Sequence, residues 1–270
     1  MLPFLKWAGG KRWFVERHIS FIPTSYERYI EPFLGSGAVF FSIEPLSAII
    51  NDVNHDLIET YQSMAIEWEK IYELLEWYDQ KHCKEFYYKI RQMHPRLTYT
   101  KAAKFIYLNR TCWNGLYRVN QKGNFNVPIG TKKRVLLETD NFFMTSQLLQ
   151  KAEICSQDFE NIIDQARERD FIFIDPPYTV RHNNNGFVKY NEKMFSWEDQ
   201  LRLYNAIEKA HRRGASFLMT NADHQCIREL YQQFSLLSLS RLSVIAANPD
   251  NRGAYSELLI TNLKLTNNTR

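Results

Sequence analysis

The sequence of 270 residues lacks the features of secreted, membrane-spanning and zinc-binding proteins. No uninterrupted apolar run approaches the ~18 residues that a membrane span needs. The N-terminus has neither the charged region nor the long apolar stretch of a signal peptide. The four cysteines lie far apart and form neither a CxxC pair nor a dense disulfide framework. We therefore expect a cytoplasmic protein without a metal site and without a membrane partner.

Acidic residues are missing from one long stretch of the chain. Residues 86–137 contain no aspartate or glutamate, although the whole sequence has 30. The same stretch holds 11 of the 34 basic residues, which leaves 23 basic against 30 acidic side chains elsewhere. A basic segment in an otherwise acidic protein indicates a polyanionic partner, most simply a nucleic acid. The alternative interpretation is a solvated basic face that binds nothing.

The apolar pattern predicts an α/β fold with a doubly wound, mostly parallel sheet. Residues 171–174, Phe-Ile-Phe-Ile, suit a central strand that is buried on both faces. A long loop is expected directly after it, at residues 179–193. The predicted strands are 29–31, 48–50, 152–155, 171–174, 216–220 and 257–261.

The region between the second and third strands has a different pattern. Residues 57–110 have mostly helical periodicity, and turn signals follow from Asn114 onward. We predict a catalytic domain built from residues 1–59 and 151–270. The inserted residues 60–150 are predicted to form a mainly helical domain that recognises DNA.

Two glycines follow the first predicted strand, in Gly35-Ser36-Gly37. Glycines let a backbone approach a ligand closely, and the helix start behind them points its N–H groups at it. Phe40 stands where the third glycine of the dinucleotide fingerprint would be, which argues against an NAD dehydrogenase. Asp52, at the end of the next strand, suits the hydroxyls of a ribose. The pattern favours an adenosine-type ligand without a pyrophosphate, the alternative being a plain tight turn.

The four residues Asp175-Pro176-Pro177-Tyr178 end the predicted central strand. Prolines have no N–H and restrict the preceding residue to extended geometry, so the strand end is stiff and its carbonyls remain acceptors. We predict that Asp175 and the Pro176 carbonyl each accept one proton of an amino group while Tyr178 stacks on its ring. The alternative is a strand-terminating turn with a buried tyrosine.

Together these segments resemble the Dam-type (D12 class) DNA adenine-N6 methyltransferases, in the order known as the alpha arrangement. The resemblance implies a Rossmann-like fold and methyl transfer from S-adenosylmethionine to N6 of a flipped-out adenine in double-stranded DNA. It further implies the recognition sequence GATC and is compatible with a monomer. The resemblance extends over most of the chain through the segments 4–11, 31–40, 51–54, 109–118, 124–130 and 175–178.

The resemblance and the basic segment together assign residues to three roles. The catalytic residues are Asp175, Pro176 and Tyr178. The residues expected to contact S-adenosylmethionine are Trp7, Lys11, Phe33, Gly35, Gly37, Asp52, Asp158, Phe159 and Asp175. The residues expected to contact DNA are Lys6, Trp113, Asn114, Leu116, Arg118, Asn126, Pro128, Lys132, Lys133 and Arg134. Within this set, Lys6 and Arg118 match positions that contact the outer guanine. Trp113 is expected to occupy or wedge the base stack that the flipped adenine leaves, as apolar side chains do between base steps.

Several alternatives remain at the level of sequence. Residues 131–140 depart from the Dam pattern, which leaves open another short adenine-containing site. Cytosine N4, RNA or a protein glutamine are other targets of related enzymes, but Asp175 favours adenine and the basic segment disfavours a protein. An inactive DNA-binding regulator is disfavoured because four residues with assigned roles are intact: Lys11, Asp52, Asp175 and Tyr178. A nucleotide deaminase fits poorly, since no His-x-Glu with a paired Cys-x-x-Cys is present.

Overall fold

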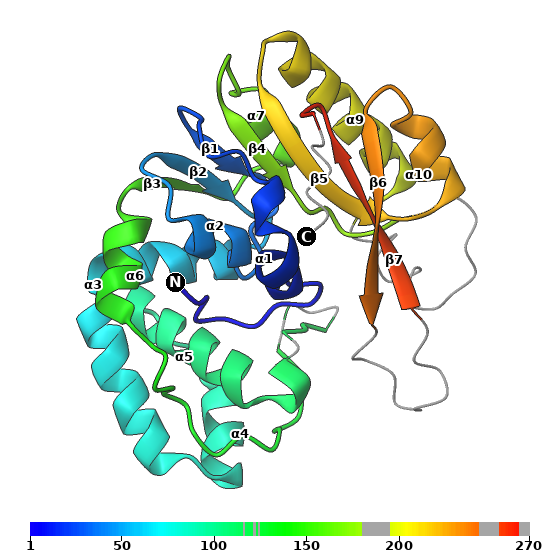
Figure 1. Ribbon diagram of the computed structural model, residues 1–270. Coiled ribbons are helices and arrows are strands. Elements are labelled where there is room, and N and C mark those ends of the chain that lie inside the picture. Colours follow the sequence, from blue (N-terminus) through cyan, green and yellow to red (C-terminus); the bar gives the residue numbers. More distant parts are fainter. Residues whose placement is uncertain (116, 121–122, 124, 180–194, 243–253, 265–270) are drawn as a thin grey trace. The chain divides into compact units, whose positions relative to one another are not determined.

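The computed structural model describes residues 1–115, 117–120, 123, 125–179, 195–242 and 254–264 (Figure 1). The chain forms two compact units. The first unit comprises Met1–Ile19 and Leu34–Gln157, and the second comprises Ser20–Phe33 and Asp158–Arg270.

The first unit contains two parallel strands, β2 (Ala48–Asn51) and β3 (Ala152–Cys155). Ala48 pairs with Ala152 and Asn51 with Cys155, so the two strands end at the same level. The helices of this unit are α1 (Arg12–His18), α2 (Ala38–Ile43), α3 (His55–Lys81), α4 (Lys84–Gln92), α5 (Thr98–Thr111), the 3-10 turn η2 (Trp113–Gly115) and α6 (Phe142–Leu149).

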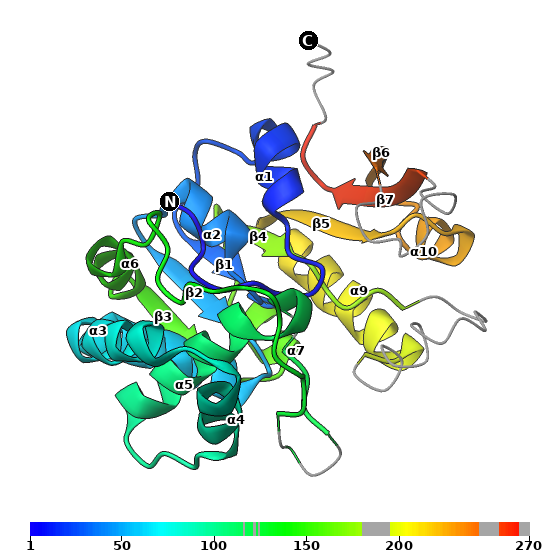
Figure 2. The ribbon, with the colours of Figure 1, turned by 90° about the horizontal axis from the view of Figure 1, so that it is seen from below.

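Helix α3 organises the packing of the first unit. Asn54 caps its N-terminus: the Asn54 side chain accepts a hydrogen bond from the backbone N–H of Leu57 at 3.1 Å and so satisfies a donor at the helix start. It packs against α5 and α6 (Figure 1), and α4 lies beside α5 (Figure 2). The predicted helical character of the segment between β2 and β3 is confirmed. The boundary of a recognition domain at residues 60–150 stays a prediction.

The second unit contains five strands in the order β1-β4-β5-β7-β6. The first three run parallel, and β7 is antiparallel to both of its neighbours. The strands are β1 (Tyr29–Glu31), β4 (Phe171–Ile174), β5 (Ser216–Ala222), β6 (Ser235–Leu242) and β7 (Ala254–Thr261). The helices are α7 (Phe159–Ile163), α9 (Trp197–Arg212) and α10 (Gln225–Leu230), and the 3-10 turn η1 (Ile19–Phe21) lies at the unit boundary.

These elements confirm the predicted fold class: in the part of the chain that the structure describes, seven mostly parallel strands flanked by helices form a Rossmann-like α/β fold. All four residues of β4 are buried, as the continuous apolar run predicted. Strand β6 was not predicted, although its Leu-Ser alternation over residues 237–240 is typical of a half-buried strand. The predicted loop at 179–193 lies, except for Thr179, outside the described residues. Among the described helices, none combines the length and apolar character needed to cross a membrane.

Candidate active site

Asp175 follows the last residue of β4 and is half-buried. Ile174 of β4 pairs in parallel with Met219 of β5, so the next residues along each strand, Asp175 and Thr220, meet. The Thr220 hydroxyl donates to Asp175 Oδ1 at 2.8 Å. This bond fixes one oxygen and therefore the plane of the carboxylate.

Tyr178 is held by a residue from a different strand. Its hydroxyl donates to Glu257 Oε2 at 2.6 Å, and Glu257, on β7, is 7% exposed. Burial, followed by the nearby carboxylates of Asp175 and Glu257, raises the pKa of Tyr178 well above its usual range. The phenol is therefore neutral and a hydrogen-bond donor at physiological pH.

The glycine turn lies between β1 and α2, and Gly35 and Gly37 both have positive φ, +49° and +65°. A Cβ at position 35 would lie 2.7 Å from Cδ1 of Trp7, so the indole ring rests directly on the backbone of the turn. The Gly35 N–H donates to Asp52 Oδ2 at 2.9 Å. Only glycine fits here, because both the φ angle and the close approach of Trp7 exclude a side chain.

Asp52 ties the glycine turn to the start of α3. Its Oδ1 accepts the backbone N–H of Asn54 at 2.9 Å, while Oδ2 accepts that of Gly35. Each carboxylate oxygen has a second lone pair, so Asp52 retains the capacity to accept ribose hydroxyls. Burial raises the pKa of Asp52, and the two backbone N–H bonds act in the opposite direction.

The second unit brings together two other predicted cofactor residues, Phe33 and Phe159. Their rings stack with centroids 5.3 Å apart. Asp158 caps α7 by accepting the Glu160 N–H at 2.9 Å and pairs with Arg202 at 2.7 Å, so it stabilises the helix start. In the first unit, the buried Lys11 directs its ammonium group to the Gly9 carbonyl at 3.1 Å.

The predicted DNA contacts at residues 113–128, called the recognition segment below, begin at η2. Trp113 is 54% exposed, and its backbone N–H donates to the carbonyl of the exposed Pro128 at 3.0 Å. Arg118 is exposed, and its Nε donates to Asn126 Oδ1 at 3.2 Å. The predicted DNA contact Leu116 lies outside the described residues.

Lys6 lies against this segment although more than a hundred residues separate it from η2. A Cβ at Gly115, which follows the exposed Asn114, would lie 2.7 Å from Cδ of Lys6. The Asn109 side chain bonds both the N–H and the carbonyl of Lys6, at 2.9 and 2.8 Å. Burial, with the charges of Lys132 and Arg12, lowers the pKa of Lys6. Lys6 thus lies beside the segment that contains Arg118, the residue predicted to contact the same outer guanine.

The sequence model of the D12 class N6 adenine-specific DNA methyltransferases matches residues 7–245. The chain belongs to this family. It is similar to the type II methyltransferase M1.LlaDCHI of Lactococcus lactis subsp. cremoris, with 33% identity over 96% of this chain and 95% of that protein. It is 34% identical to the type II methyltransferase M.MjaIII of Methanocaldococcus jannaschii (96% and 98% covered), and 32% identical to a DNA adenine methylase of Vibrio cholerae (95% and 94%).

The D12 class membership confirms the predicted enzyme class, an adenine-specific DNA methyltransferase. It also favours adenine in DNA over the alternative targets of related enzymes. Two residues of the methyltransferase that contact the predicted catalytic side chains, Thr220 and Glu257, were missed at the level of sequence. For Glu257 one signal was available, because a carboxylate at the start of the apolar strand run Glu-Leu-Leu-Ile is unusual and needs a partner.

One of the eleven basic residues in the acid-free segment of the methyltransferase has a structural role. Arg110 is buried and forms a bidentate ion pair with Asp140, with NH2 2.7 Å from Oδ1. It also donates to the carbonyls of Phe4 and Val135. Arg110 therefore stabilises the fold and adds no charge to the protein surface.

Lys132, Lys133 and Arg134, by contrast, are exposed. Arg134 approaches Asp79 only to 3.8 Å. The backbone at residues 132–134 is nevertheless held in place, because His82 Nε2 is 3.0 Å from the Lys132 carbonyl oxygen. Its charges are therefore presented to solvent from a fixed backbone.

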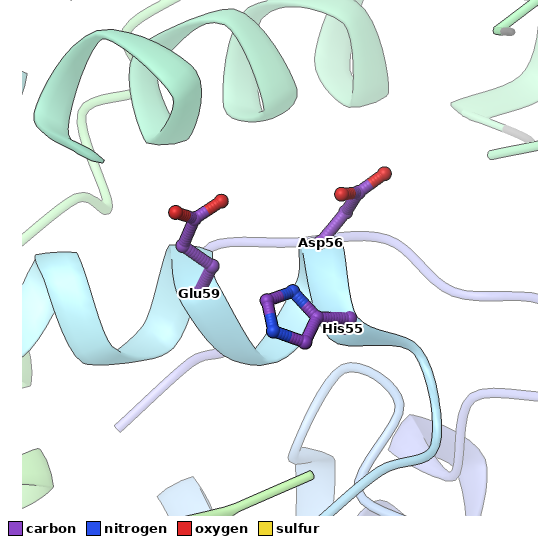
Figure 3. Close-up of side chains that lie close together, drawn as sticks. All are labelled: His55, Asp56 and Glu59. Atoms are coloured by element: carbon purple, nitrogen blue, oxygen red, sulfur yellow. The ribbon is translucent and has the colours of Figure 1, made fainter. Parts of the chain in front are cut away.

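Three possible metal ligands meet on the first turns of α3, namely His55, Asp56 and Glu59 (Figure 3). Their ligand atoms all lie within 4.8 Å of one another. Both carboxylates have partners, because Tyr117 donates to Asp56 at 3.1 Å and Lys101 to Glu59 at 2.8 Å. These contacts attach the recognition segment and α5 to α3, and we assign no ion to the cluster.

Proposed function

We propose that this methyltransferase transfers a methyl group from S-adenosylmethionine to N6 of a flipped-out adenine within GATC. The observation that carries the proposal is the strand end of β4, where Thr220 is hydrogen-bonded to Asp175 and Glu257 to Tyr178. S-adenosylmethionine, when bound, supplies the electrophilic methyl group. The residues of the chain bind the cofactor, orient the target amine and stabilise the charge that develops on it.

Asp175 and the Pro176 carbonyl compensate for a poor nucleophile. The N6 lone pair of adenine is delocalised into the ring, and hydrogen bonds from both amino protons favour a pyramidal nitrogen. Because these acceptors are fixed before the reaction, they stabilise the positive charge that develops on the nitrogen. Tyr178 provides the surface on which the extruded base stacks. Holding the amine in line with the methyl group supplies a further proximity contribution.

The residues predicted to hold the cofactor fit an adenosine-type ligand. In the first unit, Trp7 and Asp52 line a glycine turn whose backbone has no room for a side chain. In the second unit, the stacked rings of Phe33 and Phe159 provide an apolar surface suited to an adenine. No pyrophosphate-binding third glycine is needed for this ligand.

Incubating the enzyme with methyl-labelled S-adenosylmethionine and duplex DNA, followed by nucleoside analysis, tests the reaction. We expect the label on N6 of adenine, and label on N4 of cytosine would contradict the proposal. Single-molecule methylation mapping of the product tests the site. We expect GATC, and a consensus without GATC would support the second candidate, another short adenine-containing site, which the departure of residues 131–140 from the Dam pattern favours.

Replacing Arg118 with alanine is expected to relax the requirement for the outer guanine more than it slows methylation of the cognate site. An arginine that bonds guanine O6 and N7 contributes about 1–3 kcal/mol of discrimination. The measurement is the ratio of kcat/KM on GATC and on a duplex with that guanine replaced. Arg96→Ala, which removes another exposed arginine of the basic segment, is the control. Undiminished guanine preference in Arg118→Ala would contradict the assignment of Arg118 to the outer guanine.

The Lys132, Lys133 and Arg134 side chains are expected to contact phosphates. Replacing all three with glutamine should weaken binding to every sequence and flatten the dependence of log Kd on log salt, by up to ~0.9 per lost phosphate contact. Fluorescence anisotropy at several salt concentrations measures the slope. Lys84→Gln, outside this group, should leave it nearly unchanged. A triple variant with the wild-type slope would place the phosphate contacts elsewhere on the protein.

Asp52 is expected to make cofactor binding depend on pH. The carboxylate is the acceptor, and its pKa is raised, so affinity for S-adenosylmethionine should fall as pH decreases through that raised pKa. Asp52→Ala should weaken binding by roughly 1–3 kcal/mol through loss of a buried acceptor. Asp52→Asn should bind with little pH dependence. Calorimetric titrations over the acidic range measure both effects, and unchanged affinity in Asp52→Ala would refute the assignment.

A further inference from the structure

The two strands that follow β4 in the sheet hold the catalytic strand end from one side. Thr220 on β5 bonds Asp175, and Glu257 on β7 bonds Tyr178. The antiparallel register pairs Glu257 with Ala222, two residues beyond Thr220. The nearby Asp175 carboxylate also raises the pKa of Tyr178.

We infer that Glu257 is a positioning residue, which orients the Tyr178 ring for stacking on the target adenine. The inference rests on the proposed function, because it requires that Tyr178 stacks on the base.

The burial of Glu257 supports this role. A buried carboxylate is costly unless it is hydrogen-bonded, and Glu257 is 7% exposed on a strand whose next residues, Leu258 and Leu259, are fully buried. An apolar residue would suit this position in the core. The 2.6 Å bond to the Tyr178 hydroxyl gives the carboxylate a specific task there.

The bond anchors Tyr178 at the hydroxyl end of its ring. Fixing the ring before the base arrives removes side-chain entropy that stacking would otherwise cost. Burial and the adjacent carboxylates raise the pKa of Tyr178, so the proton that makes this bond is retained at physiological pH.

The test compares Glu257→Leu, Glu257→Gln and Tyr178→Phe. We expect Glu257→Leu and Tyr178→Phe each to lower kcat by about 10- to 100-fold with the KM for cofactor unchanged. Glu257→Gln keeps an acceptor oxygen and should recover most of the activity. The double variant should lose no more than either single variant, because both remove the same bond. Ser256→Ala, on the opposite face of β7, is the control.

A duplex with 2-aminopurine at the target adenine supplies a second readout. Its fluorescence reports the unstacked base, and we expect Glu257→Leu and Tyr178→Phe to change the signal of the bound complex in the same direction. Tyr178→Phe keeps the ring and the fold, so it remains informative if Glu257→Leu does not fold. Wild-type kcat and fluorescence in both single variants, or additive losses in the double variant, would overturn the inference alone. A wild-type enzyme that methylates no adenine would overturn the proposed function as well.

Discussion

Asp175→Ala is expected to lower kcat for adenine methylation by about 100- to 1,000-fold, the usual loss when a preorganised group that stabilises transition-state charge is removed. The affinity for S-adenosylmethionine should remain close to wild type, because the main task of Asp175 is to accept a hydrogen bond from the target amine. Single-turnover kinetics with labelled cofactor measure the rate, and calorimetry measures the affinity.

Thr220→Val provides the matched comparison for this prediction. It removes the hydroxyl that bonds Asp175 Oδ1 but leaves the carboxylate in place, so the loss of kcat should be smaller than in Asp175→Ala. If Asp175→Ala kept more than a tenth of the wild-type turnover, on the scale of such losses, the assigned role of Asp175 would be wrong.

Asp140→Ala is expected to reduce the free energy of unfolding by about 3–5 kcal/mol, because it leaves the buried Arg110 guanidinium without its counter-charge. The side chains of Arg110 and Asp140 are only 5% and 7% exposed, and Asp140 Oδ2 also accepts the Leu137 N–H at 2.8 Å. Arg110 would keep its bonds to carbonyl oxygens but lose the only carboxylate bonded to it among the described residues. Urea denaturation followed by circular dichroism measures the change.

The surface pair Arg212–Glu208, four residues apart on α9, in which Arg212 is exposed and Glu208 half-buried, is the control for this prediction. Arg212→Gln should cost no more than about 0.5 kcal/mol, since solvent screens an exposed pair. A loss below about 1 kcal/mol in Asp140→Ala would show that the Arg110–Asp140 pair is not what holds the segment around residues 135–140 in the fold.

The sequence by itself determined the elements whose signals are local. The run Phe171–Ile174 is apolar at every position, as expected of a strand buried on both faces, and β4 has these bounds. The glycine turn is equally local, because Gly35 and Gly37 adopt positive φ angles that other residues rarely take. The order of the motifs determined the family, which the match over residues 7–245 confirms.

The tertiary structure decided which side chains meet. Glu257 and Thr220 carry no local signal of their partners, because Tyr178 and Asp175 reach them only through the pairing of β5 with β4 and β7. Arg110 belonged by sequence to a basic segment, yet its charge is neutralised inside the protein by Asp140, thirty residues further along. Backbone conformation depends on neighbouring residues in the chain, whereas a side chain's partner depends on strand register and helix packing. Those are set by the burial of apolar surface from the whole unit.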